Sequence, residues 1–269
     1  MAFRYAELED AIVDGVRRAV EGRRVAVAFS GGLDSGLAAC LSDRYAESVT
    51  LYTCGSDGSF DVHAAEELSE TIGLPWVHVR ISEDDVEDTI RRLISATGTD
   101  DPFTISYELQ LFTVCERAPE PVVVSGQGAD EYFMGCAKYV GCTYGDYDAY
   151  VKDGVRRLMD VSVPCELAIA RHFGKTLYYP YLDDDVVGCV RRIDPAELRP
   201  ADMDSRKKVL KEVATDLGYP FLAHRTKKSS QYGSGTTDIV RALAKRRGLM
   251  YNRYIQSLYE EVFPPSEGD

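Results

Sequence analysis

The sequence predicts an α/β protein with a parallel, doubly wound sheet and a mostly helical C-terminal half. In the first half, short β-branched runs alternate with helical segments, which is typical of a parallel sheet covered by helices on both faces. Two of these runs end in glycine-rich loops, and beyond Gly145 the strand signals fade. The 269 residues, 45% of them hydrophobic, are enough to bury one large core. We expect a single domain over residues 1–269, with an α/β core at 1–145 and a helical part at 146–269.

The elements of the first half follow from their apolar patterns. A helix is expected around residues 5–20, and apolar runs predict strands at 25–29, 49–54, 76–80 and 122–125. A small-residue helix follows the first strand, and further helices are expected at 61–72, 84–96 and 106–117. In the first of these three, apolar residues share one face and the helix stops at Gly73, with Pro75 beyond it.

The second half is predicted to be helical. Helical periodicity places helices at residues 146–160, 163–173, 183–193, 204–217, 237–247 and 249–262. We interpret the acidic run Asp183 to Asp185 as a helix cap and dipole complement rather than as a metal site. The four histidines have no ligand spacing, so zinc is not expected.

Composition narrows the class of protein. A net charge of −13 argues against a broad nucleic-acid footprint. No apolar run approaches the roughly 20 residues of a membrane span, and the N-terminus resembles a helix more than a signal peptide, so we expect a cytoplasmic protein without a membrane partner. The seven cysteines are scattered, with no Cys-x-x-Cys pair, which favours reduced and mostly buried thiols.

A glycine loop links the first strand to its helix and reads Ser30-Gly31-Gly32-Leu33-Asp34-Ser35. A strand that ends in such a turn and restarts as a helix presents unpaired backbone N–H groups where the helix dipole favours an anion. The loop has the spacing of neither a Walker loop nor a dinucleotide fold. Its glycines admit phosphate oxygens, its serines add hydroxyl donors and its aspartate suits Mg²⁺. We interpret it as a phosphate cradle; an ordinary strand-to-helix turn is the alternative.

A second glycine loop follows the fourth strand and reads SGQGADE, from Ser125 to Glu131. Because the carboxyl ends of neighbouring parallel strands line one crevice, this loop can face the first. Gly126 and Gly128 allow close backbone approach to ribose and phosphate. Asp130 supplies a second carboxylate opposite the one in the first loop, and such a pair suits Mg²⁺ beside substrate phosphates. A helix cap is the alternative for the two acidic residues of the loop.

A third candidate element is basic and extends from His224 to Thr237. Departing pyrophosphate and the charge of an acyl-adenylate transition state both call for fixed cations and backbone N–H groups. Lys227 or Lys228, with the glycines at 233 and 235, can supply them. A solvated basic patch is the alternative.

In this order the motifs SGGLDS, SGQGADE, PYLDDDVV and KKSSQYGSG resemble the synthetase domain of the asparagine synthetase and β-lactam synthetase family. The resemblance extends from about Arg24 to the helix after Thr237. It implies an ATP pyrophosphatase fold of the adenine nucleotide alpha hydrolase-like type, with ATP and Mg²⁺ as cofactors. It also implies an AMP-forming carbon–nitrogen ligase that adenylates a carboxylate, releases pyrophosphate and forms an amide with ammonia or an amine. The helical part then completes the active site of the nucleotide-binding core.

The same motif matching implies the role of each site residue. Asp34 and Asp130 bind Mg²⁺, and Lys227 stabilises the transition state; the family spacing selects it over Lys228 because Gly233 lies six residues beyond it. The residues expected to hold the nucleotide are Ser30, Gly31, Gly32, Leu33, Asp34, Ser35, Thr53, Cys54, Ser125, Gly126, Gly128, Gly233 and Gly235. Within this set, the first loop holds pyrophosphate, the strand end at 53–54 meets adenine through its backbone, and the start of the second loop lies near the ribose.

Three departures from the family pattern concern the substrates. No glutaminase domain precedes the nucleotide loop, so we expect ammonia, an amine or a separate glutamine amidotransferase subunit to provide nitrogen. Thr97 stands near the place of a functional glutamate, so aspartate is not assigned as the acceptor. Gln127 replaces the usual glutamate of the second motif.

Two other functions remain beside this one. A pyrophosphatase-loop enzyme that modifies tRNA would use the same ATP chemistry, although the acidic charge and the missing Cys-x-x-Cys pairs count against it. A non-catalytic ATP-binding subunit would keep the loops without turnover, which the intact carboxylates and lysine disfavour. The tyrosines near the loops (Tyr107, Tyr132 and Tyr139) are interpreted as packing residues or as the lining of an acceptor pocket. A homodimer is left open.

Overall fold

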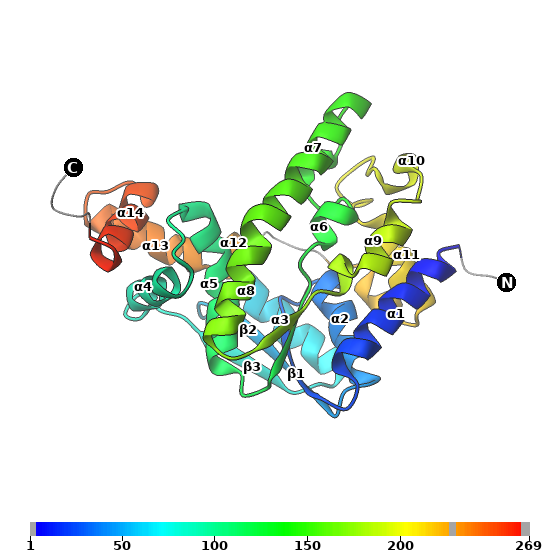
Figure 1. Ribbon diagram of the computed structural model, residues 1–269, viewed down its shortest axis with the longest axis horizontal. Helices are drawn as coiled ribbons and strands as arrows, with labels where there is room; N and C mark the ends of the chain where they lie inside the picture. The colour runs from blue at the N-terminus through cyan, green and yellow to red at the C-terminus, as the bar shows by residue number, and fades with distance from the viewer. Residues whose placement is uncertain (1–3, 226–229, 265–269) are drawn as a thin grey trace.

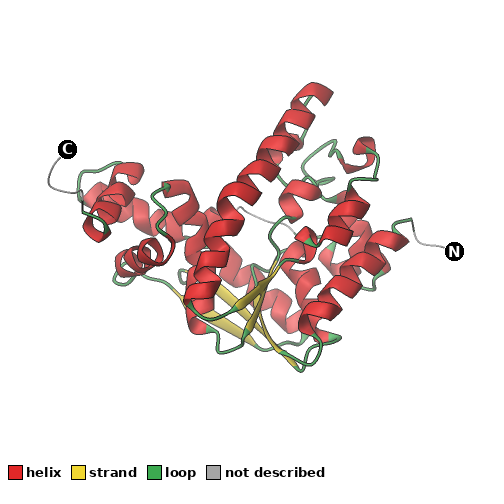
Figure 2. Cartoon of the chain, in the orientation of Figure 1, coloured by secondary structure: helices red, strands yellow, loops and turns green. Residues whose placement is uncertain are grey.

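The computed structural model describes residues 4–225 and 230–264, and it confirms the predicted doubly wound parallel sheet. The described strands are β1 (Arg24–Ala28), β2 (Ser48–Gly55), β3 (Trp76–Arg80), β4 (Val122–Ser125) and β5 (Thr176–Tyr178). All are parallel, in the order β3-β2-β1-β4-β5 (Figure 2). The chain runs outward from β1 to β3 and then returns to β4, so the strand order reverses between β1 and β4. In open α/β sheets, ligands bind outside the carboxyl ends of the strands at such a point.

Helices cover both faces of the sheet (Figure 1). The longer described helices are α1 (Ala6–Val20), α2 (Leu33–Asp43), α3 (Phe60–Ile72), α4 (Val86–Thr97), α5 (Pro102–Arg117), α7 (Tyr144–Arg157), α8 (Val163–His172), α11 (Lys208–Asp216), α13 (Thr236–Arg246) and α14 (Tyr251–Val262). The shorter ones are α6 (Ala129–Tyr132), α9 (Asp184–Val190), α10 (Pro195–Leu198) and α12 (Ser230–Gly233). A π-helical turn, Leu158–Ser162, joins α7 to α8, and α7 projects away from the body of the molecule.

The core consists of two apolar layers, one on each face of the sheet. Successive strand residues point to opposite faces, so Val25 and Val27 pack into the layer with α1 and α2, while Ala26 packs into the layer with α4 and α5. In β4, Val123 likewise faces the α5 side and its neighbours face the α2 side. Burial on both faces explains why these strands appear in the sequence as continuous apolar runs.

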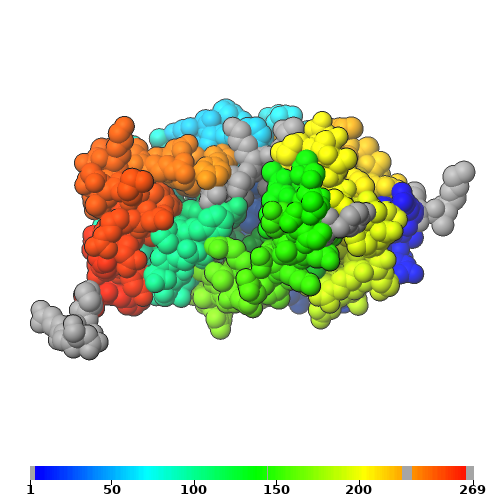
Figure 3. Space-filling view, turned by 90° about the horizontal axis from the view of Figure 1, so that it is seen from above, coloured from blue at the N-terminus to red at the C-terminus, as the bar shows by residue number. Residues whose placement is uncertain are grey.

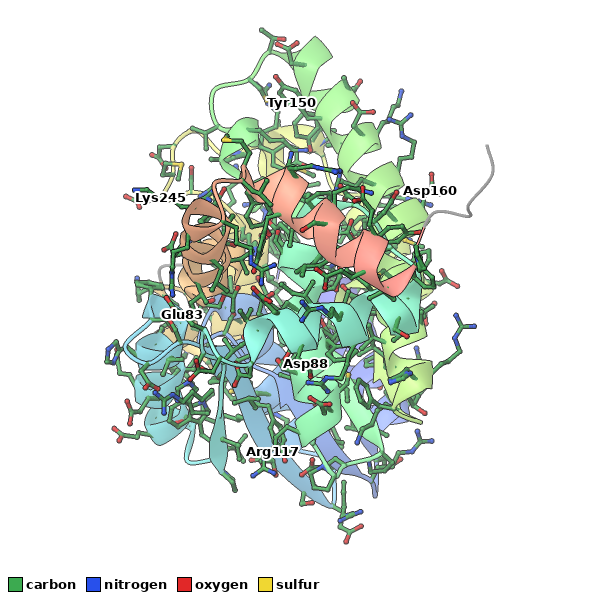
Figure 4. All side chains as sticks on the ribbon, turned by 90° about the vertical axis from the view of Figure 1, so that its left-hand side faces the viewer. Glu83, Asp88, Arg117, Tyr150, Asp160 and Lys245 are labelled. Carbon is green, nitrogen blue, oxygen red and sulfur yellow. The ribbon has the colours of Figure 1, made fainter. Side chains whose placement is uncertain are left out.

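The C-terminal helices α13 and α14 pack on α4 at one end of the molecule, and α1 lies at the other end (Figure 3). Seen from that end, α14 crosses in front of α4 (Figure 4). Tyr254, Ile255 and Leu258 of α14 are fully buried there. Arg247 adds two contacts to the Glu87 carboxylate, at 2.7 and 2.8 Å.

The structure corrects three predicted boundaries. The first correction is β5, a three-residue strand in the half that the sequence analysis predicted to be mostly helical, where no strand was placed. The second is α5, which begins at Pro102 rather than at 106, because Asp101 caps it by accepting from the Thr104 N–H at 3.0 Å. The third is α11, which begins at Lys208 rather than at 204, because Lys207 has a left-handed backbone (φ +57°).

Two further sequence predictions can be compared with the structure. All seven cysteines are free thiols, and four of them are buried, as predicted. Across the described ranges, no helix combines the length and apolar character that a membrane crossing needs.

Candidate functional site

A cleft opens at the carboxyl ends of β1, β2 and β4, where the strand order reverses. The predicted residues that line it are Ser30, Asp34, Ser35, Thr53, Cys54, Ser125, Gly126 and Asp130. Residues of α5 and α8 complete its wall. The two glycine loops therefore meet in one cleft, together with the strand end that was expected to meet adenine.

The first loop is tightly packed against α3, and this packing explains its glycine. Gly31 has φ +69°, and a Cβ atom there would lie 2.4 to 2.6 Å from the backbone of Ala64 and Ala65. Gly32 is the N-cap of α2, and the buried Leu33 contributes only its backbone to the loop.

The serines of the first loop face each other across its mouth. The backbone N–H of Ser30 donates to Ser35 Oγ at 3.2 Å, and the two hydroxyl oxygens lie 3.3 Å apart. Both hydroxyls therefore lie where they can turn toward an oxyanion at the N-terminus of α2.

The second loop touches the first. A Cβ atom on Gly126 would lie 3.1 Å from Asp34 Cβ and 3.2 Å from the Ser35 backbone nitrogen, so any side chain here would push the two loops apart by a few tenths of an ångström. Gly128, in contrast, does not line the cleft. Its φ is +89° and a Cβ atom there would lie 2.3 Å from Leu182 Cδ2, so this glycine accommodates packing outside the cleft.

A buried lysine that the sequence analysis missed joins the two predicted metal ligands. Lys207 Nζ lies 2.6 Å from Asp34 Oδ2 and 2.5 Å from Asp130 Oδ1. Its side chain is 8% exposed, and the Asp34 side chain is 7% exposed. Only the pattern Lys207-Lys208 marked this residue in the sequence, and such pairs are usually solvated.

The contacts of Lys207 show whether one cation can reach both loops at once. A single positively charged atom already contacts a carboxylate oxygen of Asp34 and one of Asp130. Two carboxylates with phosphate oxygens as the remaining ligands form a donor set that Mg²⁺ prefers. The residues present therefore fit the metal that the sequence predicts.

The nucleoside end of the cleft is apolar and its side chains are already hydrogen-bonded. Thr53 Oγ1 donates to the Phe29 carbonyl at 2.6 Å and accepts from Trp76 Nε1 at 2.9 Å. Burial raises the pKa of the Cys54 thiol to about 12, so this thiol is neutral. The Thr53 hydroxyl of this strand end is thus already engaged and the Cys54 thiol is neutral, and contact between the backbone here and adenine stays a prediction. Leu111 and Val114 of α5 form the facing apolar wall.

The third predicted element lies partly outside the described residues. Lys227 and Lys228 lie outside the described residues. Gly233 and Gly235 line a neighbouring groove near the N-terminus of α3 rather than the cleft itself. A Cβ atom on Gly233 would lie 2.1 Å from the Asp61 carboxylate, and Asp61 also lines the cleft. The turn at 233–235 therefore packs against the start of α3, beside the cleft.

Two buried glutamates at the far end of the cleft were also missed. Glu108 of α5 and Glu166 of α8 are each 3% exposed, and both line the cleft. Gln127, noted earlier as a departure in the second motif, donates from Nε2 to Glu166 Oε1 at 2.7 Å. No spacing in the sequence pairs a residue of α5 with one of α8.

Of the remaining predicted polar residues, one lines the cleft and the others lie outside its lining. Tyr107 lines the cleft, whereas Tyr132 and Tyr139 are buried in the core. Thr97 ends α4 and donates to the Leu93 carbonyl at 2.8 Å, outside the cleft lining. Asp183 is a helix cap, as predicted, because it accepts from the Asp185 N–H at 3.2 Å.

Comparisons with known proteins agree with the motif pattern. The asparagine synthase family model matches residues 7–152, which is more than half of the chain. A Methanocaldococcus jannaschii protein named as an asparagine synthetase (glutamine-hydrolyzing) is 29% identical over 91% of this chain and 52% of its own length. The Arabidopsis thaliana asparagine synthetase (glutamine-hydrolyzing) 1 is 26% identical over 73% of this chain and 36% of its own length. The chain thus spans about half, or less, of these curated relatives.

Among solved structures, NMN synthetase from Francisella tularensis is similar with a TM-score of 0.44 and 14% sequence identity. That alignment covers 100% of this chain and 99% of the other.

Proposed function

Because the chain belongs to the asparagine synthase family, we propose that it is an AMP-forming carbon–nitrogen ligase that uses ATP to adenylate a carboxylate. The acyl group then passes to ammonia or an amine, and the products are an amide, AMP and pyrophosphate. One observation carries the proposal. Two glycine loops on neighbouring strands touch at Gly126, and their carboxylates, Asp34 and Asp130, converge on one cation position.

The residues of the cleft have separate roles in this proposal. Backbone N–H groups of the first loop and the hydroxyls of Ser30 and Ser35 bind the departing pyrophosphate. The base lies between the 53–54 strand end and the apolar wall of α5. Asp34 and Asp130 would hold Mg²⁺, which neutralises phosphate charge when bound.

Two parts of the proposal come from the motifs. Lys227 stabilises the charge that develops as pyrophosphate leaves. The relatives' names describe glutamine hydrolysis, and for this chain the nitrogen that enters the amide is ammonia or an amine.

The test is pyrophosphate release from ATP and Mg²⁺, measured with a panel of carboxylic acids in the presence of ammonium or amines. At least one carboxylate should provoke pyrophosphate release that is stoichiometric with AMP. Lys227→Ala should lower turnover by about 10²-fold or more while leaving ATP affinity nearly unchanged, because its interaction belongs to the transition state. Lys228→Ala is the matched control and should stay close to wild type.

Two outcomes contradict this assignment. If ATP binds but no carboxylate in the panel provokes pyrophosphate release, the chain is a nucleotide-binding subunit rather than a ligase. If tRNA alone provokes release, the tRNA-modifying alternative replaces the proposal.

A further inference from the structure

Two residues other than glycine have a left-handed backbone in the described part of the chain. They are Met134 and Lys207, each with φ +57°. This conformation is costly for a residue with a side chain, and it persists only where the surrounding structure enforces it. Lys207 forms an ion pair with Asp130, and Met134 precedes Gly135, which packs on the same pair. The strained backbone on both sides therefore marks the Asp130 carboxylate as a group that the fold holds in one position.

Gly135 lies directly against the ion pair. A Cβ atom at Gly135 would lie 2.0 Å from Asp130 Oδ1 and 2.1 Å from Lys207 Cε. Both are side-chain atoms, whereas a Cβ atom at Gly31 would meet backbone. Gly135 is not among the residues with positive φ, so its backbone would accept an alanine. The missing side chain at Gly135 thus provides the space in which Asp130 and Lys207 meet, and the turn itself does not require glycine.

Asp130 needs this support because its own helix is short. It lies in α6, which has four residues, and its side chain is 33% exposed. The backbone N–H of Gly135 donates to the Asp130 carbonyl at 2.9 Å and closes the turn that follows α6. Gly135 therefore holds the backbone of Asp130 and also limits where its carboxylate can lie.

Arg206 joins this turn to the segment that carries the lysine. Its Nη1 donates to the Gly135 carbonyl at 2.9 Å, and its Nε donates to the Met203 carbonyl at 2.9 Å. A guanidinium group is planar and rigid, so the two bonds fix its orientation. Hydrogen bonds from a charged donor are also stronger than neutral ones. Because Lys207 follows Arg206 in the chain, its backbone is anchored to Gly135 through this arginine.

We propose that Gly135 and Arg206 are positioning residues that determine how Asp130 meets the cation between the two glycine loops. Gly135 leaves the space for the contact, and Arg206 keeps Gly135 and Lys207 at a fixed separation. Neither positioning residue lines the cleft, so each acts through Asp130 and Lys207. Their role toward Mg²⁺ rests on the proposed function, whereas their role toward the Lys207 ion pairs does not.

The first experiment measures how well the structure protects Lys207. The full chain is treated with a limiting amount of acetic anhydride, and peptide mass spectrometry gives the acetylation of Lys207 relative to the exposed Lys208. This ratio should be low in the wild type, because Lys207 is buried and ion-paired. In Gly135→Ala it should rise at least 10-fold, because the added methyl group displaces the carboxylate and the lysine stem. Gly145→Ala is the matched control, since Gly145 has no positive φ and nothing within 4 Å of an added Cβ.

Variants of Arg206 test the anchor and keep the inference open to refutation if Gly135→Ala does not fold. Arg206→Met removes both hydrogen bonds and should raise the acetylation ratio at least 5-fold. Arg206→Lys keeps a charged donor and should give a ratio between those of Arg206→Met and the wild type. Arg44→Met is the matched control, because Arg44 also donates to a distant backbone carbonyl, that of Leu217 at 2.6 Å, but lies outside the cleft lining. It should react like the wild type.

The second experiment measures Mn²⁺ binding in the presence of ATP, from the electron paramagnetic resonance signal of the free ion. Mn²⁺ takes the same oxygen ligands as Mg²⁺. Its affinity should fall at least 10-fold in Gly135→Ala and 5-fold in Arg206→Met, and it should be unchanged in Gly145→Ala and Arg44→Met.

The outcomes separate this inference from the proposed function. Equal acetylation of Lys207 in all variants, or equal increases in Gly135→Ala and Gly145→Ala, would overturn the inference. Altered acetylation with the same Mn²⁺ affinity in every variant would overturn the role toward the metal. If acetylation separates the variants but the wild type binds no Mn²⁺ with ATP, the positioning role holds and the proposed function fails.

Discussion

At the scale of single residues, Lys207 determines the charge balance between the two loops of the candidate site. Its ammonium group is buried between Asp34 and Asp130, so it neutralises charge that the fold would otherwise leave inside the cleft. A buried ion pair contributes little net stability compared with an apolar replacement, but removal of one partner leaves an uncompensated charge. The lysine therefore allows the two carboxylates, which we propose as metal ligands, to lie close together.

Lys207→Met should lower the free energy of unfolding by roughly 3–5 kcal/mol, measured by urea denaturation. Added Mg²⁺ should restore part of this loss, because a divalent cation would replace the positive charge that the substitution removes from the two carboxylates. Lys208→Met is the control, since Lys208 is exposed, and it should change stability by less than about 0.5 kcal/mol. Equal losses in the two variants would show that the Lys207 ion pairs contribute nothing specific.

The residues of the candidate site could be predicted from the sequence in the two glycine loops, but not at the ends of the cleft. Asp34 and Asp130 lie within motifs whose local geometry follows from a strand, a turn and a helix. Lys207 and Glu166 come from the second half of the chain and reach the cleft only through tertiary packing. No local periodicity encodes such a position.

At the scale of elements, the contact between the first loop and α3 determines how closely the phosphate cradle can pack. A side chain at Gly31 would collide with the backbone at Ala64, which cannot move without shifting α3. The left-handed φ of Gly31 adds a second cost for any other residue.

Gly31→Ala should therefore destabilise the protein by more than about 2 kcal/mol and should abolish ATP binding. Gly22→Ala is the matched control, because Gly22 has nearly the same φ, +65°, with nothing within 4 Å of the added Cβ. It should cost only about 1 kcal/mol, measured by urea denaturation, and should leave ATP binding intact. If the two variants behaved alike, backbone conformation alone would account for Gly31.

Helices and strands could be predicted from the sequence where the pattern of buried residues and the capping residues indicate the same boundaries. The residues of β1 and β4 are buried on both faces of the sheet and therefore form continuous apolar runs in the sequence. For this reason the sequence analysis placed both strands correctly. β5 has three residues and pairs with β4 alone, so its segment is too short for a period-two pattern. The start of α5 was misplaced because the Asp101-Pro102 pair, a cap followed by an N1 proline, was not used as a start signal.

At the scale of the whole molecule, the second half of the chain completes the sheet of the first half. β5 pairs with β4, and the buried Tyr181 hydroxyl donates to the Asp34 carbonyl at 2.7 Å. The α/β core predicted at 1–145 thus lacks one strand, the lysine between its carboxylates and one wall of its cleft.

A fragment of residues 1–145 should consequently fail to unfold cooperatively in a circular dichroism melt, because its β4 edge and both apolar layers are exposed. Mixed with a fragment of residues 146–269, it should regain a cooperative transition. A cooperative melt of the first fragment alone would show that the α/β core folds independently.

Gln127 gives the far end of the cleft a partner that does not titrate. Its amide now donates an N–H to Glu166. When Glu166 takes up a proton, a half-turn of the same amide offers a carbonyl oxygen to the new O–H. A carboxylate at position 127 can only accept, and it would repel Glu166 in the ionised state. The neutral amide thus keeps this end of the cleft hydrogen-bonded through a complete cycle of proton gain and loss.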